Sequence, residues 1–232
     1  MNILFVHFGE EALAGSEIAL LELLRALPRA EVTPTVWCNG HKMAEAVIKL
    51  GIPVVRDDFA LFFHYGSPQF SPRHYARMVR KGVALIEQTG AQLVHCNSGA
   101  PAQWMTPAAW RKRTPLLVYS HSPYIRRGRY TMGLHLADRV VAVAAAIAEP
   151  LLADGMDPSR ISVVYNGFDE AAVLQGDAKA LRADLGIPAD AVVGAIVGSL
   201  IRRKGHDVLF EAMRRLEPGG APFHLLVVGD GP

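Results

Sequence analysis

The sequence has few cysteines, no long apolar run and little net charge, and each absence narrows the class of protein. Only Cys38 and Cys96 occur among 232 residues, too few for a disulfide framework, and each follows an apolar strand, where a free cysteine is usually buried. No apolar run is long enough to span a membrane. A formal charge of +2 gives no general case for binding nucleic acid. We therefore expect a cytoplasmic protein.

The motifs of several common enzyme classes are also missing. Segment 9–17 lacks the G-x-G-x-x-G order of a dinucleotide-binding loop, and segment 198–205 lacks the order of a P-loop. The sequence has no G-x-S-x-G motif. No group of His, Cys and carboxylate residues has metal-ligand spacing. These absences argue against a dehydrogenase, a kinase and a serine hydrolase, and no metal site is predicted.

What is present is a regular alternation of apolar strands with helices. Short apolar runs predict strands at residues 3–7, 32–38, 52–55, 92–96, 115–121, 139–143 and 161–165. Strands that alternate with helices form a parallel, doubly wound sheet, which is an α/β fold. Ligands of such folds bind at the carboxyl ends of the strands. Ser16 is predicted to cap the first helix, and Asn166-Gly167 predicts a tight turn.

A second strand–turn–helix–strand pattern begins near the end of the chain. Residues 191–197 read as a buried strand, a helix opens at Lys204-Gly205, and residues 223–228 read as a further strand. The polar stretch before them reads as a linker. We predict an N-terminal domain at 1–168, a linker at 169–177 and an incomplete second domain at 178–232. The ligand cleft is expected between the two domains.

Two basic features have both an ordinary and a functional interpretation. In the second domain, the basic turn before the helix that opens at Lys204-Gly205 brings cations and backbone N–H groups together, which suits a diphosphate. A solvated turn is an equally good interpretation. The helix predicted at 72–89 has an apolar face and a basic face, the latter formed by Arg73, Arg77, Arg80 and Lys81. Most such faces are simply solvated, and the alternative is contact with an anionic membrane or an acidic partner. The aromatic segment 56–71 precedes this helix.

A series of short motifs, in order, resembles one known family. They are Ala14-Gly15-Ser16-Glu17, Leu93-Val94-His95, Ser120-His121-Ser122, Ala137-Asp138-Arg139-Val140, Asn166-Gly167-Phe168-Asp169, Arg203-Lys204-Gly205 and Val228-Gly229-Asp230-Gly231. Each motif alone is weak, but their order and spacing resemble the retaining glycosyltransferases of family 4. The resemblance implies the GT-B fold, in which two Rossmann-like domains face each other.

The resemblance also implies a reaction and the residues that carry it. A sugar passes from a nucleoside-diphosphate donor to a carbohydrate or lipid-linked acceptor with retention of configuration, and neither a metal nor another cofactor takes part. Donor and diphosphate contacts fall to Gly15, Ser16, Arg203 and Lys204. His121 is the candidate catalytic residue through a hydrogen bond to the donor sugar, and its ordinary role is that of a strand-end histidine. Asn97 and Ser98 are assigned to the acceptor side, although plain loop polarity explains them equally well.

The sequence departs from the family pattern at two places. Ser199 stands where the family has an arginine after the glycine, which leaves Arg202 or Arg203 to contact the phosphates. The family's Glu-x7-Glu segment is absent from the 232 residues, so we expect a fragment or one part of a split enzyme, with no sugar transfer by this chain alone. An exposed apolar face on the second domain is then expected to meet a second copy, a partner chain or the remainder of the protein. The other functions that stay open are a nucleotide-sugar epimerase of the same fold and a non-catalytic module that binds the acceptor or a partner. Peripheral membrane contact would accompany a lipid-linked acceptor.

Overall fold

The structure of the chain is a computed structural model, which describes residues 1–9, 11, 13–59, 61–62, 71–215 and 223–231. Clustering of contacts divides the chain into two compact units, Met1–Asp169 and Glu170–Pro232. Helix α7 (Glu170–Val173) lies within the stretch expected to be a linker, so this segment is partly helical.

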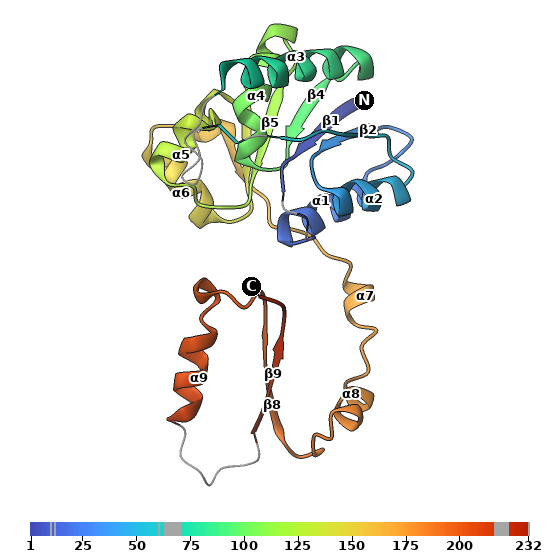
Figure 1. Cartoon of the computed structure of the whole chain (residues 1–232), viewed down its shortest axis with the longest axis vertical. Coiled ribbons are helices and arrows are strands. Elements are labelled where there is room, and N and C mark those ends of the chain that lie inside the picture. Colours follow the sequence, from blue (N-terminus) through green and yellow to red (C-terminus); the bar gives the residue numbers. More distant parts are fainter. Residues whose placement is uncertain (10, 12, 60, 63–70, 216–222, 232) are drawn as a thin grey trace. The chain divides into compact units, whose positions relative to one another are not determined.

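The first unit is a parallel sheet with helices on both faces (Figure 1). In the described part of the chain its strand order is β3-β2-β1-β4-β5-β6-β7. The strands are β1 (Asn2–His7), β2 (Thr33–Cys38), β3 (Val54–Arg56), β4 (Leu93–Cys96), β5 (Leu116–Ser120), β6 (Arg139–Ala142) and β7 (Ile161–Val163). The helices are α1 (Gly15–Ala26), α2 (His41–Lys49), α3 (Pro72–Thr89), α4 (Gly99–Lys112), α5 (Arg126–Thr131) and α6 (Ala145–Ala153), with 3₁₀ turns η1 (Leu134–Leu136) and η2 (Pro158–Arg160). The predicted doubly wound α/β fold is confirmed.

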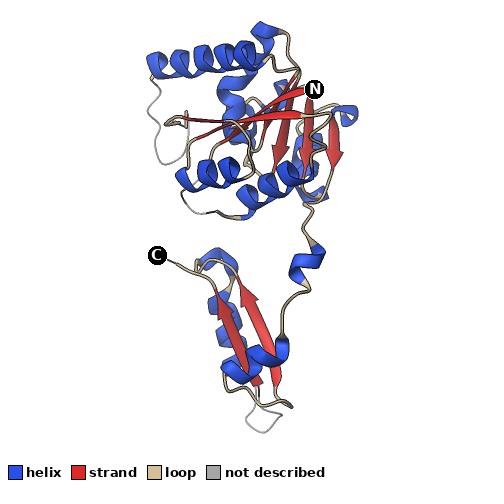
Figure 2. Ribbon diagram, turned by 90° about the vertical axis from the view of Figure 1, so that its right-hand side faces the viewer, coloured by secondary structure: helices blue, strands red, loops and turns tan. Residues whose placement is uncertain are grey.

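Alternation along β1 separates the core into two layers. Leu4 and Val6 pack with residues of α3 and α4 on one face of the sheet. Ile3 and Phe5 pack with residues of α1 and α2 on the other face. Successive side chains of a strand point to opposite faces of the sheet. Because helices cover both faces, the side chains on both sides of β1 are buried and apolar. The layers are visible in Figure 2.

Helix α3 begins and ends where the sequence predicts. The Ser71 hydroxyl accepts a hydrogen bond from the backbone N–H of His74 at 3.3 Å, Pro72 occupies the first turn, and Gly90 ends the helix with φ of 60°. That backbone conformation favours glycine. Within the basic face of this helix, Lys81 Nζ lies 3.7 Å from Asp57 Oδ2. Residues 63–70 of the aromatic segment lie outside the described residues.

Two local predictions are wrong. Ser16 does not cap α1: the helix already begins at Gly15 after Ala14, and the Ser16 hydroxyl donates to Glu17 instead. Asn166-Gly167 forms no tight turn, because the chain there is irregular and the Gly167 φ is not positive. The Asn166 side chain accepts a hydrogen bond from the Tyr119 hydroxyl, a contact from another strand that a local turn rule does not consider.

The second unit has its own small sheet. Strands β8 (Val192–Val197) and β9 (Phe223–Val228) pair in parallel, apart from the sheet of the first unit, and are joined through η3 (Arg202–Lys204) and α9 (His206–Arg214). Helix α8 (Ala178–Asp184) precedes them. Several apolar side chains of this unit are exposed, Val197 to 75%. The expectation of an exposed apolar surface on this unit therefore agrees with the described residues, whereas its partner remains a prediction.

Candidate functional site

Three neighbouring strands of the first unit end in polar side chains on the same face of the sheet. Phe5 and His95 are register partners on β1 and β4, and His95 pairs in turn with Leu117 on β5. His7, Asn97 and His121 each follow on that same face, because every second residue of a strand points the same way. All three lie at the carboxyl ends of β1, β4 and β5, the edge where doubly wound folds bind ligands.

These side chains form a continuous hydrogen-bonded chain. His121 Nε2 lies 3.3 Å from Asn97 Oδ1. The Asn97 Nδ2 atom lies 3.1 Å from His7 Nδ1 and 2.9 Å from the Ser16 carbonyl oxygen. His7 Nε2 lies 2.8 Å from Glu17 Oε1. Asn97, His7 and Glu17 are almost fully buried, so these hydrogen bonds are shielded from water.

Helix α1 brings the carboxylate of Glu17 to the end of this chain. Glu17 is 3% exposed, and its Oε2 accepts hydrogen bonds from the Ala14 N–H at 3.2 Å and the Ser16 hydroxyl at 3.0 Å. Burial raises the pKa of Glu17, but the hydrogen bond and charge of His7, with the backbone and Ser16 bonds, lower that pKa overall. The carboxylate therefore remains charged beside His7.

His121 is held as a neutral ring at ordinary pH. Burial, opposed by the charge of Glu17, lowers the pKa of His121 to about 4. The Tyr119 ring lies 4.5 Å from the His121 ring, between centroids, and the Tyr119 hydroxyl donates to Asn166 at 2.8 Å. A neutral imidazole has one N–H donor and one acceptor nitrogen, so His121 can bind a hydroxyl group without carrying charge.

Two other predicted site residues, Gly15 and Ser98, lie around the same strand ends. Gly15 is exposed, and a Cβ added there would meet no described atom within 4 Å. The backbone at Gly15 is therefore open to a ligand at the start of α1. The Ser98 hydroxyl is buried without a hydrogen-bond partner among the described residues. An unpaired buried hydroxyl is costly, so Ser98 is a candidate for contact with a ligand.

The predicted diphosphate cations lie in the second unit. Arg203 and Lys204 are exposed on η3, directly before α9. The aliphatic part of Lys204 covers Gly198, where an added Cβ would lie 3.7 Å from its Cδ. Gly198 and Gly229 have φ of 152° and 147°, a backbone conformation that favours glycine. A Cβ at Gly229 would also lie 2.1 Å from the Gly198 carbonyl oxygen. Across the residues that the structure describes, no three His, Cys, Asp or Glu side chains are grouped to hold a metal ion.

Sequence reasoning did not select His7, Glu17 or Tyr119 as site residues. The signal for Tyr119 was its position on the same face of β5 as His121. The signal for His7 was its place at the end of β1, on the face that it shares with Asn97 after β4. Glu17 belongs to the Ala14-Gly15-Ser16-Glu17 motif, but its contact with His7 depends on how α1 packs on the sheet. Applying the alternation of side chains across neighbouring strands would have placed His7 and His121 on the same face of the sheet.

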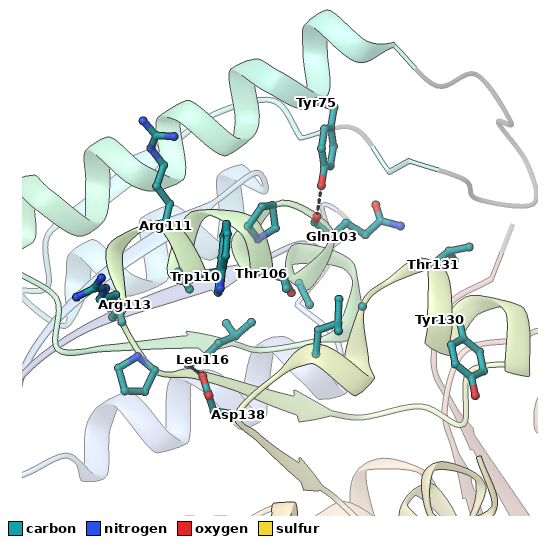
Figure 3. Close-up of a pocket in the computed structure, with 17 residues that line it drawn as sticks. Tyr75, Gln103, Thr106, Trp110, Arg111, Arg113, Leu116, Tyr130, Thr131 and Asp138 are labelled. Atoms are coloured by element: carbon teal, nitrogen blue, oxygen red, sulfur yellow. Dashed lines mark hydrogen bonds between the residues drawn. The ribbon is translucent and has the colours of Figure 1, made fainter. Parts of the chain in front are cut away.

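A separate open groove of about 1120 Å³ lies along α4 (Figure 3). Leu116 at the start of β5 and Asp138 just before β6 line it, and the Leu116 N–H donates to Asp138 at 2.8 Å. The groove therefore reaches the amino ends of these strands, whereas His121 lies at the carboxyl end of β5. Trp110 on its rim is 84% exposed.

Buried histidines make the first unit sensitive to acid. Burial, with the charge of His121, lowers the pKa of His95 to about 3, and the pKa of His121 is about 4. Unfolding returns both pKa values to about 6.5, so the unfolded chain binds more protons than the folded chain. The stability of the fold therefore falls as the pH drops below about 6.5. His95 alone should cost about 2 kcal/mol at pH 5. We expect thermal melts to show this loss, and His95→Leu to make the pH dependence shallower; an unchanged slope would contradict it.

With this geometry in place, comparison with known proteins identifies the class. The chain belongs to Glycosyltransferase Family 4, whose model matches residues 13–172. The D-inositol 3-phosphate glycosyltransferase 1 of Catenulispora acidiphila is 41% identical over 81 residues, 34% of this chain and 19% of that protein. The D-inositol 3-phosphate glycosyltransferase of Mycobacterium bovis BCG is 35% identical over 97 residues, 41% of this chain and 19% of that protein. The family match therefore gives the class of protein to which the chain belongs.

Solved structures show the same fold. A glycosyltransferase from Rickettsia africae has a TM-score of 0.78 at 20% identity, over 99% of this chain and 60% of that chain. The Anabaena protein HepE in complex with UDP has a TM-score of 0.75 at 20% identity, over 100% of this chain and 62% of that chain. These likenesses confirm the expected GT-B fold class. The chain spans about three fifths of these solved chains, and the stretch matched in the curated relatives is 19% of their length.

Proposed function

We propose that the protein transfers a sugar from a nucleoside-diphosphate donor to a carbohydrate or lipid-linked acceptor with retention of configuration. The observation that carries the proposal is the placement of a neutral His121, in a family 4 chain, at the carboxyl edge of the sheet. HepE was solved with UDP and with UDP-glucose, which supports a UDP-linked donor. The reaction separates an oxocarbenium-like sugar from a diphosphate, and preorganised polar groups must stabilise both.

The proposed roles follow the chemistry of each residue. His121 accepts a hydrogen bond from a hydroxyl group of the donor sugar. The open backbone at Gly15 allows the donor to approach closely beside Ser16, and the charges of Arg203 and Lys204 bind the diphosphate. Ser98 supplies a hydroxyl on the acceptor side. The amide of Asn97 is hydrogen-bonded to His121, His7 and Ser16, so we assign it a supporting role instead of direct acceptor contact.

The reaction itself is tested with protein expressed from its complete reading frame. UDP-glucose and related nucleotide sugars are supplied with candidate acceptors, and UDP release and the anomeric configuration of the product are measured. Transfer with retention that persists in a chelator supports the proposal. Conversion of the donor sugar without an acceptor would identify an epimerase instead. A Listeria monocytogenes protein described as a putative UDP-N-acetylglucosamine 2-epimerase has a TM-score of 0.60 to this chain. Binding of the acceptor with no turnover would favour a non-catalytic module.

Lys204→Ala is expected to weaken UDP binding about tenfold at low salt. A charge-assisted hydrogen bond to a phosphate contributes about 1.5 kcal/mol, and salt screens this contribution. Isothermal titration with UDP at two salt concentrations measures the effect. Lys179→Ala, on α8 of the same unit, is the matched control. Equal affinities for wild type and Lys204→Ala would remove Lys204 from the diphosphate site.

A lipid-linked acceptor would bring the first unit to a membrane surface. None of the described helices is both long and apolar enough to cross a bilayer. Arg73, Arg77 and Arg80 are exposed on α3, and each basic residue near an anionic surface contributes ~1 kcal/mol. We expect the protein to float with anionic liposomes but not with neutral ones. A variant in which the three arginines are replaced by uncharged residues should no longer float with the anionic liposomes. Equal recovery with both kinds of liposome would oppose this role.

A further inference from the structure

The orientation of the Asn97 amide is determined by the groups around it. The Ser16 carbonyl oxygen can only accept a hydrogen bond. The atom of Asn97 that lies 2.9 Å from it must therefore be the amide nitrogen, Nδ2. The amide oxygen Oδ1 then faces His121 Nε2 at 3.3 Å. An amide oxygen has no hydrogen to give, so His121 must donate from Nε2.

The same reasoning extends to the other end of the chain. Asn97 Nδ2 has two hydrogens: one goes to the Ser16 carbonyl, and the other points to His7 Nδ1 at 3.1 Å. His7 Nδ1 must therefore accept, which places the His7 hydrogen on Nε2. That hydrogen is donated to Glu17 Oε1 at 2.8 Å. Every donor in the series meets an acceptor, and the direction runs from His121 through Asn97 and His7 to the Glu17 carboxylate.

We propose that Asn97 is a positioning residue that holds His121 in the tautomer with hydrogen on Nε2 and a free electron pair on Nδ1. His121 Nδ1 has no hydrogen-bond partner among the described residues. It is thus presented as an acceptor to a ligand hydroxyl group. That this hydroxyl belongs to the donor sugar rests on the proposed function; the tautomer itself does not.

The surrounding groups preserve this state near neutral pH. His121 is faced by His7 on β1, Glu17 on α1, His95 on β4 and Tyr119 on β5. Burial is the largest cause that keeps the pKa of His121 at about 4, and the charge of Glu17 opposes it. Because Nε2 already carries a hydrogen, a proton gained in acid goes to Nδ1. Acid would therefore change the ligand-facing atom of His121 from an acceptor to a donor.

The test is long-range ¹H–¹⁵N NMR of the histidine side chains in the 232-residue chain, without any ligand. The wild type is expected to show His121 protonated on Nε2 and unprotonated on Nδ1 from pH 6 to 8. A wild-type spectrum with His121 protonated on Nδ1 would overturn the proposal, and this measurement requires no mutant to fold.

Two variants isolate the contribution of Asn97. Asn97→Leu removes the acceptor and is expected to shift His121 toward a mixture of tautomers. Asn39→Leu is the matched control, because Asn39 follows the neighbouring strand β2 and its side chain bonds the Gly9 backbone, at 2.8 and 3.0 Å, and not His121. It should leave the His121 signals unchanged. An unaltered His121 tautomer in folded Asn97→Leu would contradict the assignment. If Asn97→Leu fails to fold, Asn97→Asp keeps the shape and an acceptor beside His121 and should raise the His121 pKa.

The NMR experiment and the transfer assay fail independently. If the tautomer is as stated but no nucleotide sugar is bound or turned over, the proposed function fails and the assignment of Asn97 stands. If transfer occurs but His121 has the other tautomer, only the role of Asn97 is wrong. Should both hold, Asn97→Leu, which removes the acceptor of His121 Nε2, is expected to lower kcat/KM about tenfold, the size of one hydrogen bond. Asn97→Asp keeps an acceptor there and should instead shift the pH profile toward higher pH.

Discussion

His121→Ala is expected to reduce sugar transfer by about 100-fold. The neutral imidazole offers a preorganised acceptor at the strand ends, and losing one such preorganised group at a reacting centre typically costs about two orders of magnitude. The loss should appear mainly in kcat if the contact strengthens as the sugar becomes cationic. Transfer by protein expressed from its complete reading frame, followed by UDP release, measures it.

The control for this substitution is His74→Ala on α3. His74 lies at the amino end of that helix and contacts Phe62 and Arg77. Its removal should leave transfer unchanged when the acceptor is water-soluble. Full activity of His121→Ala would exclude a direct role for this histidine and leave it as an ordinary strand-end residue.

Glu17→Ala is expected to destabilise the first unit by about 3 kcal/mol. The Glu17 carboxylate and His7 are both nearly fully buried, and removing one member of a buried pair leaves its partner without a hydrogen bond. The Ala14 N–H and the Ser16 hydroxyl lose their acceptor as well. In a unit of this size the melting temperature should fall by about 6–12 °C.

Glu22→Ala on the same helix is the matched comparison. Glu22 pairs with Arg25 at the surface, and an exposed ion pair contributes at most about 1 kcal/mol. Differential scanning calorimetry of the 232-residue chain should therefore separate the two variants clearly. Similar melting temperatures for both would show that the His7–Glu17 pair adds little to folding.

The sequence by itself determined the class of fold and the positions of most elements. Apolar β-branched runs and amphipathic periodicity depend on neighbours only a few residues apart, and they predicted α3 to the residue and the confirmed parallel sheet. The burial of Cys38 and Cys96 followed from their place after apolar strands. The order of family motifs identified the glycosyltransferase class that the family match then showed.

Only the tertiary structure decided which polar side chains meet. Residues His7, Glu17, Asn97 and His121 come from four separate stretches, and their contact depends on the strand order β1-β4-β5 and on the packing of α1. Strand order cannot be read from local periodicity, because the apolar pattern of β1 would be the same whichever strands lay beside it. Ser16 shows the same limit: it was predicted to cap the first helix, but the packed helix already begins at Gly15, and the Ser16 hydroxyl donates to the buried Glu17 carboxylate. Local patterns thus specify elements, whereas the geometry of the site depends on contacts between residues far apart in the chain.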